Sequence, residues 1–393
     1  MKFQEFRFRR VESLPPYVFA QINELKRELR HAGRDVIDLG FGNPDIPSPA
    51  IAVEKLREAA LRPVNHRYSV SRGLPQLRAA LTELYERRFG VSLDPDTQVV
   101  ATIGAKEALS HLMWVLVEPG DSAIVPSPSY PIHLFAPVFA GATTVEAQLT
   151  PSFADAVLEA YERTLPRPRV AILSFPHNPT TATATREDLQ RLVDFALERG
   201  VLLVHDFAYA DIAFDGYRPP SLLEIPGALD CSVELYSLTK SFSMAGWRVG
   251  FVAGRADVVG ALAKLKSYLD YGTFQPIQIA SIVAMREAPD YPDEVSEIYR
   301  GRRDALCSGL DRAGWHVEPP QATMFVWAPV PERFRDRGSL EFAFELAREA
   351  DVAVSPGIGF GKHGEGFVRF ALVENEQRIG QAVRNIRQFL QRD

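Results

Sequence analysis

Short apolar runs alternate with amphipathic helical patterns through the middle of this chain. One intervening stretch, Arg186–Arg199, places Leu189, Leu192 and Val193 on a single helical face. The apolar runs are rich in β-branched residues and are bounded by Gly, Pro, Asn or Asp, which is typical of buried strands. They are Val99–Ile103, Ser122–Val125, Thr143–Gln148, Val170–Ser174, Val201–His205, Ser232–Ser237 and Trp247–Ala253. This alternation predicts a parallel sheet covered by helices.

The pattern changes after Ser281. The elements expected there are a long polar helix around Asp293–Leu310, strands at Thr323–Ala328, Val352–Val354 and Phe367–Ala371, a helix near Leu340–Ala350 and a final helix. The first forty or so residues are rich in charge and contain Pro15-Pro16-Tyr17, which indicates an arm that joins this second domain.

We therefore predict an α/β protein in three stretches. Residues 1–45 form the N-terminal arm and part of the small domain. Residues 46–284 form a large domain with a mainly parallel seven-stranded sheet covered by helices. Residues 285–393 complete a smaller α+β domain.

Composition favours a protein that acts on small molecules. The 393 residues are 46% hydrophobic and 24% charged, with a formal net charge of -6 and a pI of about 5.8. A nucleic-acid or anionic-membrane surface would need a basic patch, so we predict neither partner. Cys231 and Cys307 lie far apart without a C-x-x-C pattern, and the histidines lack a metal-ligand spacing, so we predict no disulfide framework and no metal. The chain shows no signal peptide and no apolar run long enough to span a bilayer, which predicts a cytoplasmic protein.

The segment from Ser237 to Phe251 is the most informative for chemistry. Lys240 follows a predicted strand, among small residues and with few carboxylates nearby in sequence, which suits an amine whose pKa must fall before it attacks a carbonyl. Ser237 and Arg248 flank it and could hold a phosphate. Taken alone, a lysine among serines is more often solvated surface.

Two further predicted strands end in polar side chains. Asp206 follows Val201–His205, at the edge where open α/β sheets bind ligands, and its carboxylate could keep a pyridine nitrogen protonated. An acid that caps the next helix is about as common. Asn178 follows Val170–Ser174 and could donate to a phenolate oxygen on a cofactor ring, although an Asn-Pro turn explains it as structure.

Two more segments fit a phosphorylated ring. Gly104-Ala105-Lys106 stands between a predicted strand and a helix, where free amides form an anion site, although a lone glycine there is often only a tight turn. Tyr130 follows the next strand and could stack on a flat ring, although buried packing is the usual role of such a tyrosine.

Together these segments resemble the fold-type I, class I and II aminotransferases over nearly the whole chain. The separations Asn178 to Asp206, Asp206 to Tyr209, Ser237 to Lys240 and Lys240 to Arg248 agree with that family's pattern. Within the family, five segments look most like the bacterial glutamate–pyruvate (alanine) aminotransferases. They are Pro15–Phe19, Tyr130–His133, His205–Asp211, Tyr271–Phe274 and Ser355–Gly361. One departure is Thr181-Ala182-Thr183, where many relatives carry a glycine.

The resemblance implies pyridoxal 5'-phosphate as cofactor and assigns residues to it. Lys240 would bind it as a Schiff base and then move the proton between the substrate α-carbon and the cofactor. Asp206 would hold the pyridinium, and Asn178 and Tyr209 the ring oxygen. The remaining cofactor contacts would be Tyr130, stacked on the ring, and Gly104, Ala105, Lys106, Ser237 and Arg248, around the phosphate.

The resemblance also implies substrate contacts and a homodimer with active sites at the subunit interface. Arg369 would grip the substrate α-carboxylate, and the backbone of Gly40 would approach it. Asn178 belongs to the same substrate set. Tyr68 would reach the phosphate of the partner subunit. Tyr17, on the arm, is a candidate lid contact, although it could equally anchor the arm.

The implied reaction is reversible transfer of an amino group from alanine or glutamate to a 2-oxo acid, in a ping-pong sequence. Other donors, such as aspartate or diaminopimelate, are alternatives, because no arginine stands out as the reader of a side-chain carboxylate. A lyase or decarboxylase on the same fold ranks lower. So does a cofactor-binding regulator, since the arm before Gly40 is too short for a DNA-binding module.

Overall fold

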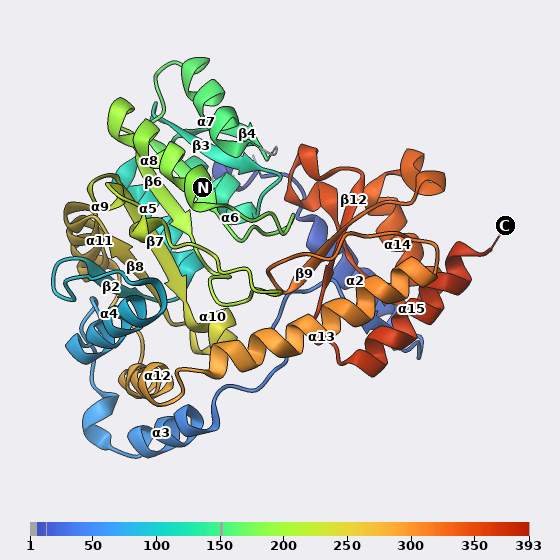
Figure 1. Cartoon of the computed structure of the whole chain (residues 1–393), viewed down its shortest axis with the longest axis horizontal. Helices are drawn as coiled ribbons and strands as arrows, with labels where there is room; N and C mark the ends of the chain where they lie inside the picture. Colours follow the sequence, from blue (N-terminus) through green and yellow to red (C-terminus); the bar gives the residue numbers. More distant parts are fainter. Residues whose placement is uncertain (1–5, 13, 150–151, 393) are drawn as a thin grey trace, which may run out of the picture.

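The large domain is built on one seven-stranded sheet, as the computed structural model shows (Figure 1). The structure describes residues 6–12, 14–149 and 152–392. The strands lie in the order β2-β8-β7-β6-β5-β3-β4, and all run parallel except β8. Their bounds are β2 Val99–Thr102, β3 Ser122–Ser127, β4 Thr143–Gln148, β5 Val170–Ser174, β6 Leu202–Asp206, β7 Ser232–Ser237 and β8 Gly250–Gly254. The predicted mainly parallel seven-stranded sheet is confirmed.

The seventh strand is shorter at its start than the sequence pattern predicted. Trp247 closes a 3-10 turn (η3, Ala245–Trp247), and Arg248 adopts a left-handed conformation with φ 58°. That conformation breaks an extended chain, so β8 begins only at Gly250. The connection between β7 and β8 therefore contains the short helix α10 (Leu238–Ser241) and η3, and α10 carries Lys240.

Helices cover both faces of the sheet because alternate strand residues point to opposite sides. In β5, Val170 and Ile172 pack with the layer of α5 and α11, whereas Ala171 and Leu173 pack with α7 and α8. The helices of the large domain are α3 Ala50–Ala60, α4 Pro75–Phe89, α5 Ala105–Leu116, α6 Pro131–Phe139, α7 Phe153–Glu162, α8 Arg186–Arg199, α9 Ala228–Cys231, α10 Leu238–Ser241, α11 Ala256–Leu269 and α12 Gln275–Glu287. The 3-10 turns η1 Pro63–His66 and η2 Leu222–Glu224 complete it.

The smaller domain combines both ends of the described chain. Its antiparallel sheet β11-β12-β9 stands beside a parallel pair, β1 with β10. Its elements are α2 Val18–His31, β1 Ile37–Asp38, α13 Tyr291–Arg312, β9 Phe325–Pro329, η4 Glu332–Arg337, α14 Gly338–Ala350, β10 Val352–Ala353, β11 Ser355–Pro356, η5 Gly357–Phe360, η6 Lys362–Gly364, β12 Phe367–Ala371 and α15 Glu376–Leu390. A single apolar cluster joins Ile22 and Ile37 to residues such as Leu306 and Phe370. The N-terminal segment therefore belongs to this core.

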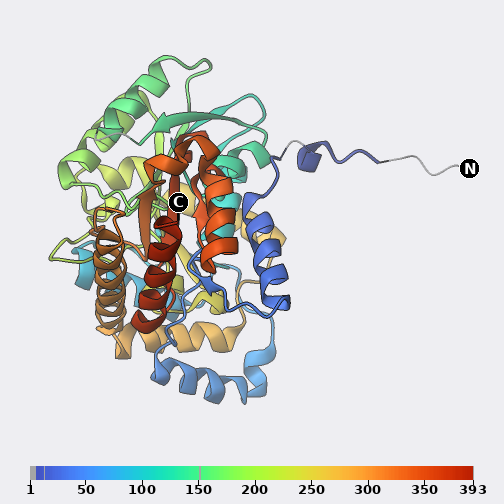
Figure 2. The same ribbon diagram turned by 90° about the vertical axis from the view of Figure 1, so that its right-hand side faces the viewer.

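The apolar clusters of the large sheet and of the smaller domain support the division that we propose, into an arm, a large domain and a small domain. The boundary placed after residue 284 falls inside α12, which packs on α3 and α4, so we propose that the large domain ends with that helix. The start of the arm, with α1 (Arg9–Glu12), extends away from the body (Figure 2). Residues 1–5 of the predicted arm lie outside the described residues. Nowhere in the described ranges is a helix both long and apolar enough to cross a bilayer.

The start of α8 offers a test of the local stability of this fold. The Thr185 hydroxyl accepts from the backbone N–H of Asp188 at 3.2 Å, and the Asp188 carboxylate accepts from that of Thr185 at 3.0 Å. Thr185→Ala should lower the free energy of unfolding by about 1 kcal/mol, because it leaves a helix amide without its cap. Thr185→Ser keeps the hydroxyl and serves as the control. Urea unfolding that shows no difference between the two variants would contradict this role of the cap.

Candidate active site

A cavity of about 290 Å³ opens between the large sheet and the small domain, at the carboxyl ends of the parallel strands. Strands that run the same way end at one edge, so residues far apart in sequence meet there. Twelve residues predicted from the sequence line the cavity. They are Tyr17, Gly40, Ala105, Lys106, Tyr130, Asn178, Asp206, Tyr209, Ser237, Lys240, Arg248 and Arg369. Two predicted residues do not line the cavity. Gly104 lies against the guanidinium of Arg248, and Tyr68 is exposed elsewhere on the surface.

Lys240 stands on the short helix α10 with its amine directed into the cavity. Its Nζ donates to the backbone carbonyl of Gly42 at 2.8 Å. Burial, followed by the positive charges of Arg369 and Arg248, lowers the pKa of Lys240 to about 7. Close to neutral pH, a substantial fraction of this amine is therefore uncharged and can attack a carbonyl carbon.

Gly42 is a functional position that sequence reasoning missed. A Cβ at this residue would lie 2.7 Å from the ring of Phe325, so any side chain would displace the aromatic wall. Only glycine lets the Gly42 carbonyl approach Lys240 at this point. The sequence does contain a signal for it, because Gly42 stands two residues after Gly40 and directly before Asn43-Pro44.

Asp206 ends β6 and is held by two donors. His133 Nε2 lies 2.8 Å from Asp206 Oδ2, and the backbone N–H of Ala208 donates to Oδ1 at 3.2 Å. The Ser129 hydroxyl lies 2.8 Å from His133 Nδ1. This network assigns the ring proton to Nε2, because the carboxylate can only accept. His133 is buried and was not predicted as a site residue, although it follows Tyr130 by one helical turn.

Asn178 links two other predicted site residues. Its Nδ2 donates to the Tyr209 hydroxyl oxygen at 3.3 Å, and its Oδ1 accepts from Arg369 at 2.7 Å. Burial raises the pKa of Tyr209, so its hydroxyl keeps its proton and can donate. In the turn beyond Asn178, Thr181 adopts φ 62°, the left-handed conformation that glycine provides in many relatives. The turn thus keeps its shape with a threonine.

The N-terminus of α5 and Arg248 form a pocket suited to an anion. The first amides of a helix have no acceptor within it and carry partial positive charge. Gly104, before α5, has φ 84°, and a Cβ there would lie 2.2 Å from a guanidinium nitrogen of Arg248. Ser237 is at the same side of the cavity, with its hydroxyl 2.9 Å from that of Thr239. The arrangement joins helix amides, hydroxyl groups and a guanidinium around one point.

Tyr130 and Lys106 form the wall next to this pocket. The Lys106 ammonium lies 5.8 Å from the centre of the Tyr130 ring. Burial raises the pKa of Tyr130, which keeps the ring neutral. A neutral aromatic face beside an anion pocket can stack on a flat, phosphorylated ring.

Arg369, on β12, is the deepest cation of the cavity. It is only 5% exposed and donates to neutral oxygens, those of Gly40 at 3.0 Å and Asn178 at 2.7 Å. Its guanidinium carbon also lies 4.0 Å from the centre of the Phe325 ring. Within the described residues no carboxylate pairs with Arg369, and its Nε has no acceptor. Burial lowers the pKa of Arg369 to about 10. A buried guanidinium in these surroundings can bind a small carboxylate.

Tyr17 and Tyr68 differ in position. Tyr17 begins α2 and lines the cavity mouth, with its ring edge-on to Phe19 at 5.3 Å between ring centres. Tyr68 lies outside the cavity of its own chain, is 84% exposed and stands 4.6 Å from the ring of Tyr271. That position is compatible with the predicted contact to a partner subunit, which stays a prediction.

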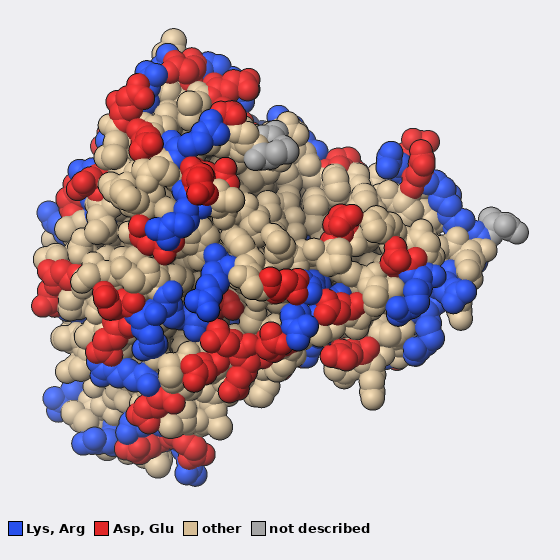
Figure 3. Space-filling model, in the orientation of Figure 1, with Lys and Arg blue, Asp and Glu red and all other residues tan. Residues whose placement is uncertain are grey.

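Acidic and basic side chains are mixed over the face in Figure 3, beside an uncharged region that runs between the two domains. The cavity that contains Lys240, Arg248 and Arg369 lies between these two domains.

Three comparisons agree. The model of the family "Aminotransferase class I and II" matches residues 34–386. The chain is 47% identical to the glutamate-pyruvate aminotransferase AlaC of Escherichia coli over 99% of its own length and 95% of that protein. It is 42% identical to the LL-diaminopimelate aminotransferase of Desulforudis audaxviator over 96% of each chain. The substrate-bound BacF structure from "Bacillus subtillis" superposes with a TM-score of 0.91, at 33% identity and 98% coverage of both chains. The chain therefore belongs to the class I and II aminotransferases, enzymes that work with pyridoxal phosphate.

Proposed function

We propose that this aminotransferase exchanges the amino group of alanine or glutamate with a 2-oxo acid. The observation that carries the proposal is a pair of basic groups in one cavity. They are Lys240, an amine with a pKa of about 7, and Arg369, a buried guanidinium that has no carboxylate partner among the described residues. An amino acid supplies that carboxylate. The similarity to a glutamate-pyruvate aminotransferase supports this choice of substrates.

The cavity has groups suited to each part of pyridoxal phosphate. The N-terminus of α5, Ser237 and Arg248 would hold the phosphate, and Asp206 would pair with a protonated ring nitrogen. Asn178 and Tyr209 would donate to the ring oxygen, and Tyr130 would stack on the ring. The attachment point would be the amine of Lys240. When bound, the cofactor withdraws electrons from the α-carbon of the substrate.

Three side chains would have separate roles in the reaction. Arg369, held in place by Gly40 and Asn178, would bind the α-carboxylate with two parallel hydrogen bonds. Lys240, once free, would take the proton from the substrate α-carbon and deliver it to the cofactor. His133 would keep Asp206 oriented, because its Nε2–H donates to that carboxylate. A fixed α-carboxylate also disfavours decarboxylation at this site.

The wall that would face the substrate side chain is mainly apolar. Phe19, Ile22, Phe41 and Phe360 line it. Lys26 also lines the cavity, but its ammonium is paired with Asp38 at 2.6 Å. A small uncharged side chain therefore fits with little desolvation cost, which favours alanine as one donor. Diaminopimelate stands as the second candidate, because a relative that acts on it is 42% identical.

Single half-reactions test the choice of donor. The purified yellow enzyme is mixed with one amino acid at a time, and loss of the cofactor's absorbance is followed. We expect conversion with alanine and with glutamate, and recovery of the yellow form on addition of pyruvate or 2-oxoglutarate. Lys240→Ala should bind some cofactor and convert nothing.

Silence with both alanine and glutamate would contradict the proposed donors. If diaminopimelate or aspartate converted the enzyme instead, the alternative donor would replace them. Conversion by Lys240→Ala at the rate of the unchanged enzyme would contradict the role of the lysine.

We also propose a homodimer whose subunits complete each other's sites. Large apolar side chains gather, exposed, around the segment that carries Tyr68. They include Leu61, Val64, Val70, Tyr271 and Phe274. Exposed apolar groups in such number are typical of a protein interface. Across it, the Tyr68 hydroxyl would donate to the phosphate held by the partner's α5.

Tyr68→Phe removes that hydroxyl and should weaken cofactor binding roughly tenfold or more, the effect of losing a hydrogen bond to a charged group. A mixed dimer of one Tyr68→Phe chain and one Lys240→Ala chain gives a sharper test. In it, one site pairs an intact Lys240 with the intact Tyr68 of the other chain, so that site should bind the cofactor as tightly as the unchanged enzyme. The measurement is cofactor affinity after mixing the two variants. No recovery on mixing would show that Tyr68 does not act across an interface.

A further inference from the structure

Lys266 is a fully buried cation that the proposed reaction does not use. It lies on α11 and is 0% exposed. Its Nζ donates to Glu107 Oε1 at 3.0 Å and to Asp270 Oδ2 at 2.9 Å. One ammonium thus joins three segments: the body of α11, the first turn of α5 and the loop that follows α11.

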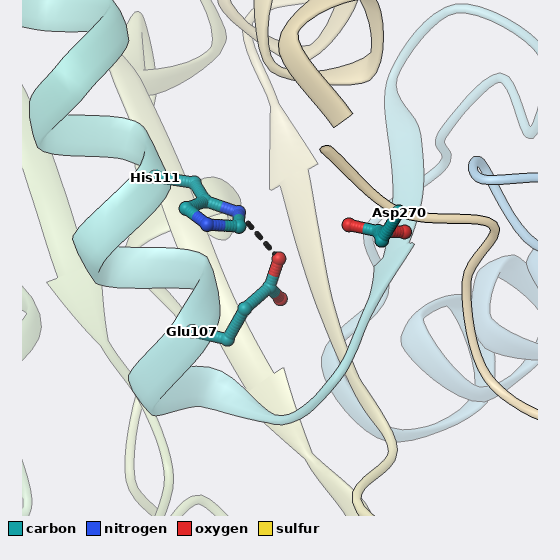
Figure 4. Close-up of side chains that lie close together, drawn as sticks. All are labelled: Glu107, His111 and Asp270. Atoms are coloured by element: carbon teal, nitrogen blue, oxygen red, sulfur yellow. Dashed lines mark ion pairs between the residues drawn. The ribbon is translucent and has the colours of Figure 1, made fainter. Parts of the chain in front are cut away.

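The two carboxylates and His111 would otherwise resemble a metal site. Figure 4 shows Glu107 and His111 one turn apart on α5, with Asp270 facing them from the other segment. His111 Nδ1 lies 2.5 Å from Glu107 Oε1 but makes no hydrogen bond of acceptable angle there. The Lys266 ammonium already contacts both carboxylates and supplies the positive charge that a metal would bring. The cluster is therefore an ion-pair network with its own cation.

Both carboxylates hold backbone next to the anion pocket. Glu107 Oε2 accepts from the N–H of Ile103 at 2.9 Å, just before Gly104 and the start of α5. Asp270 Oδ1 accepts from the N–H of Gly272 at 2.7 Å. In the same loop, the Thr273 hydroxyl lies 3.5 Å from the backbone oxygen of Arg248. The carboxylates shape the pocket, yet their charge opposes an anion bound there.

We propose that Lys266 is a positioning residue for phosphate binding: its positive charge offsets one of the two negative charges of Glu107 and Asp270, so that both can brace the pocket while the N-terminus of α5 stays attractive to a phosphate dianion. This rests on the part of the proposed function that puts the cofactor phosphate at α5. The carboxylates hold the backbone around the pocket, and Lys266 reduces the repulsion between their negative charge and a bound phosphate.

The proposal makes a prediction that depends on charge alone. Lys266, Glu107 and Asp270 together carry a formal charge of about -1 when all are ionised. Lys266→Met makes the cluster more negative by one, Glu107→Gln makes it less negative by one, and the double variant restores the original sum. One added negative charge this close to a dianion should weaken binding on the order of tenfold.

Three ligands separate the phosphate effect from a general loss of structure. They are pyridoxal phosphate, pyridoxal, which lacks the phosphate, and inorganic phosphate as a competitor. Dissociation constants are measured at pH 8.5, where an ordinary imidazole carries no charge. Lys264→Met, which removes an exposed lysine from the same helix, is the matched control.

Lys266→Met should bind pyridoxal phosphate and inorganic phosphate on the order of tenfold more weakly, with pyridoxal unchanged. The Lys266→Met, Glu107→Gln double variant should recover most of the loss. Glu107→Gln alone should bind phosphate as tightly as the unchanged enzyme or more tightly, and Lys264→Met should change nothing. If Lys266→Met alone fails to fold, the double variant is compared with Glu107→Gln. It carries one more negative charge, so it should bind pyridoxal phosphate more weakly than Glu107→Gln, with pyridoxal unchanged.

Equal weakening of pyridoxal and pyridoxal phosphate in Lys266→Met would overturn the proposal, because it indicates a general structural role. So would unchanged binding in that variant, or no recovery in the double variant. No amino acid takes part in this measurement, so the proposed donors do not affect it. An unchanged enzyme that bound pyridoxal as tightly as its phosphate would instead contradict the placing of the phosphate at α5.

Discussion

The buried guanidinium of Arg369 is the constraint on which the rest of the site depends. A charge taken out of water is costly unless hydrogen bonds hold it. Arg369 is held by oxygens from three distant segments: Gly40 near the start of the chain, Asn178 after β5, and Ser355 at 3.4 Å in the small domain. The cation therefore binds both domains and the N-terminal segment to one point. Since those oxygens are neutral, its charge stays available to a ligand.

That available charge also acts on Lys240. Arg369 and Arg248 each contribute, after burial, to the lowered pKa of Lys240, so the two groups that we propose as anion receptors also help keep the amine reactive. Asp206, an acid that lines the same cavity, is oriented by His133. Lys266, outside the cavity, pairs with Glu107 and Asp270, two carboxylates that hold backbone next to the anion pocket.

Much of this could be predicted from sequence for a physical reason. Alternating buried strands and helices specify a parallel sheet, and polar residues at the strand ends must then meet at one edge. Asn178, Asp206 and Lys240 were found in this way, and the family resemblance gave them roles. The predicted start of β8 was wrong, because the left-handed conformation of Arg248 that ends the extended chain has no sequence signal of its own.

What the sequence could not give are contacts made across long separations. The collision that keeps Gly42 a glycine involves Phe325, and the cation that balances Glu107 is Lys266 on another helix. Neither pair has a spacing that a single sequence reveals. The contact predicted for Tyr68 depends on a second chain.

The most direct test of this account is the substitution of Arg369. Half-reaction kcat/KM is measured for alanine and for ethylamine, which lacks the carboxylate, in the unchanged enzyme, Arg369→Lys and Arg369→Gln. The account predicts that Arg369→Gln lowers the value for alanine about a hundredfold and leaves that for ethylamine almost unchanged, with Arg369→Lys in between because it keeps the charge and loses the fork. An unchanged ratio of alanine to ethylamine in Arg369→Gln would contradict it.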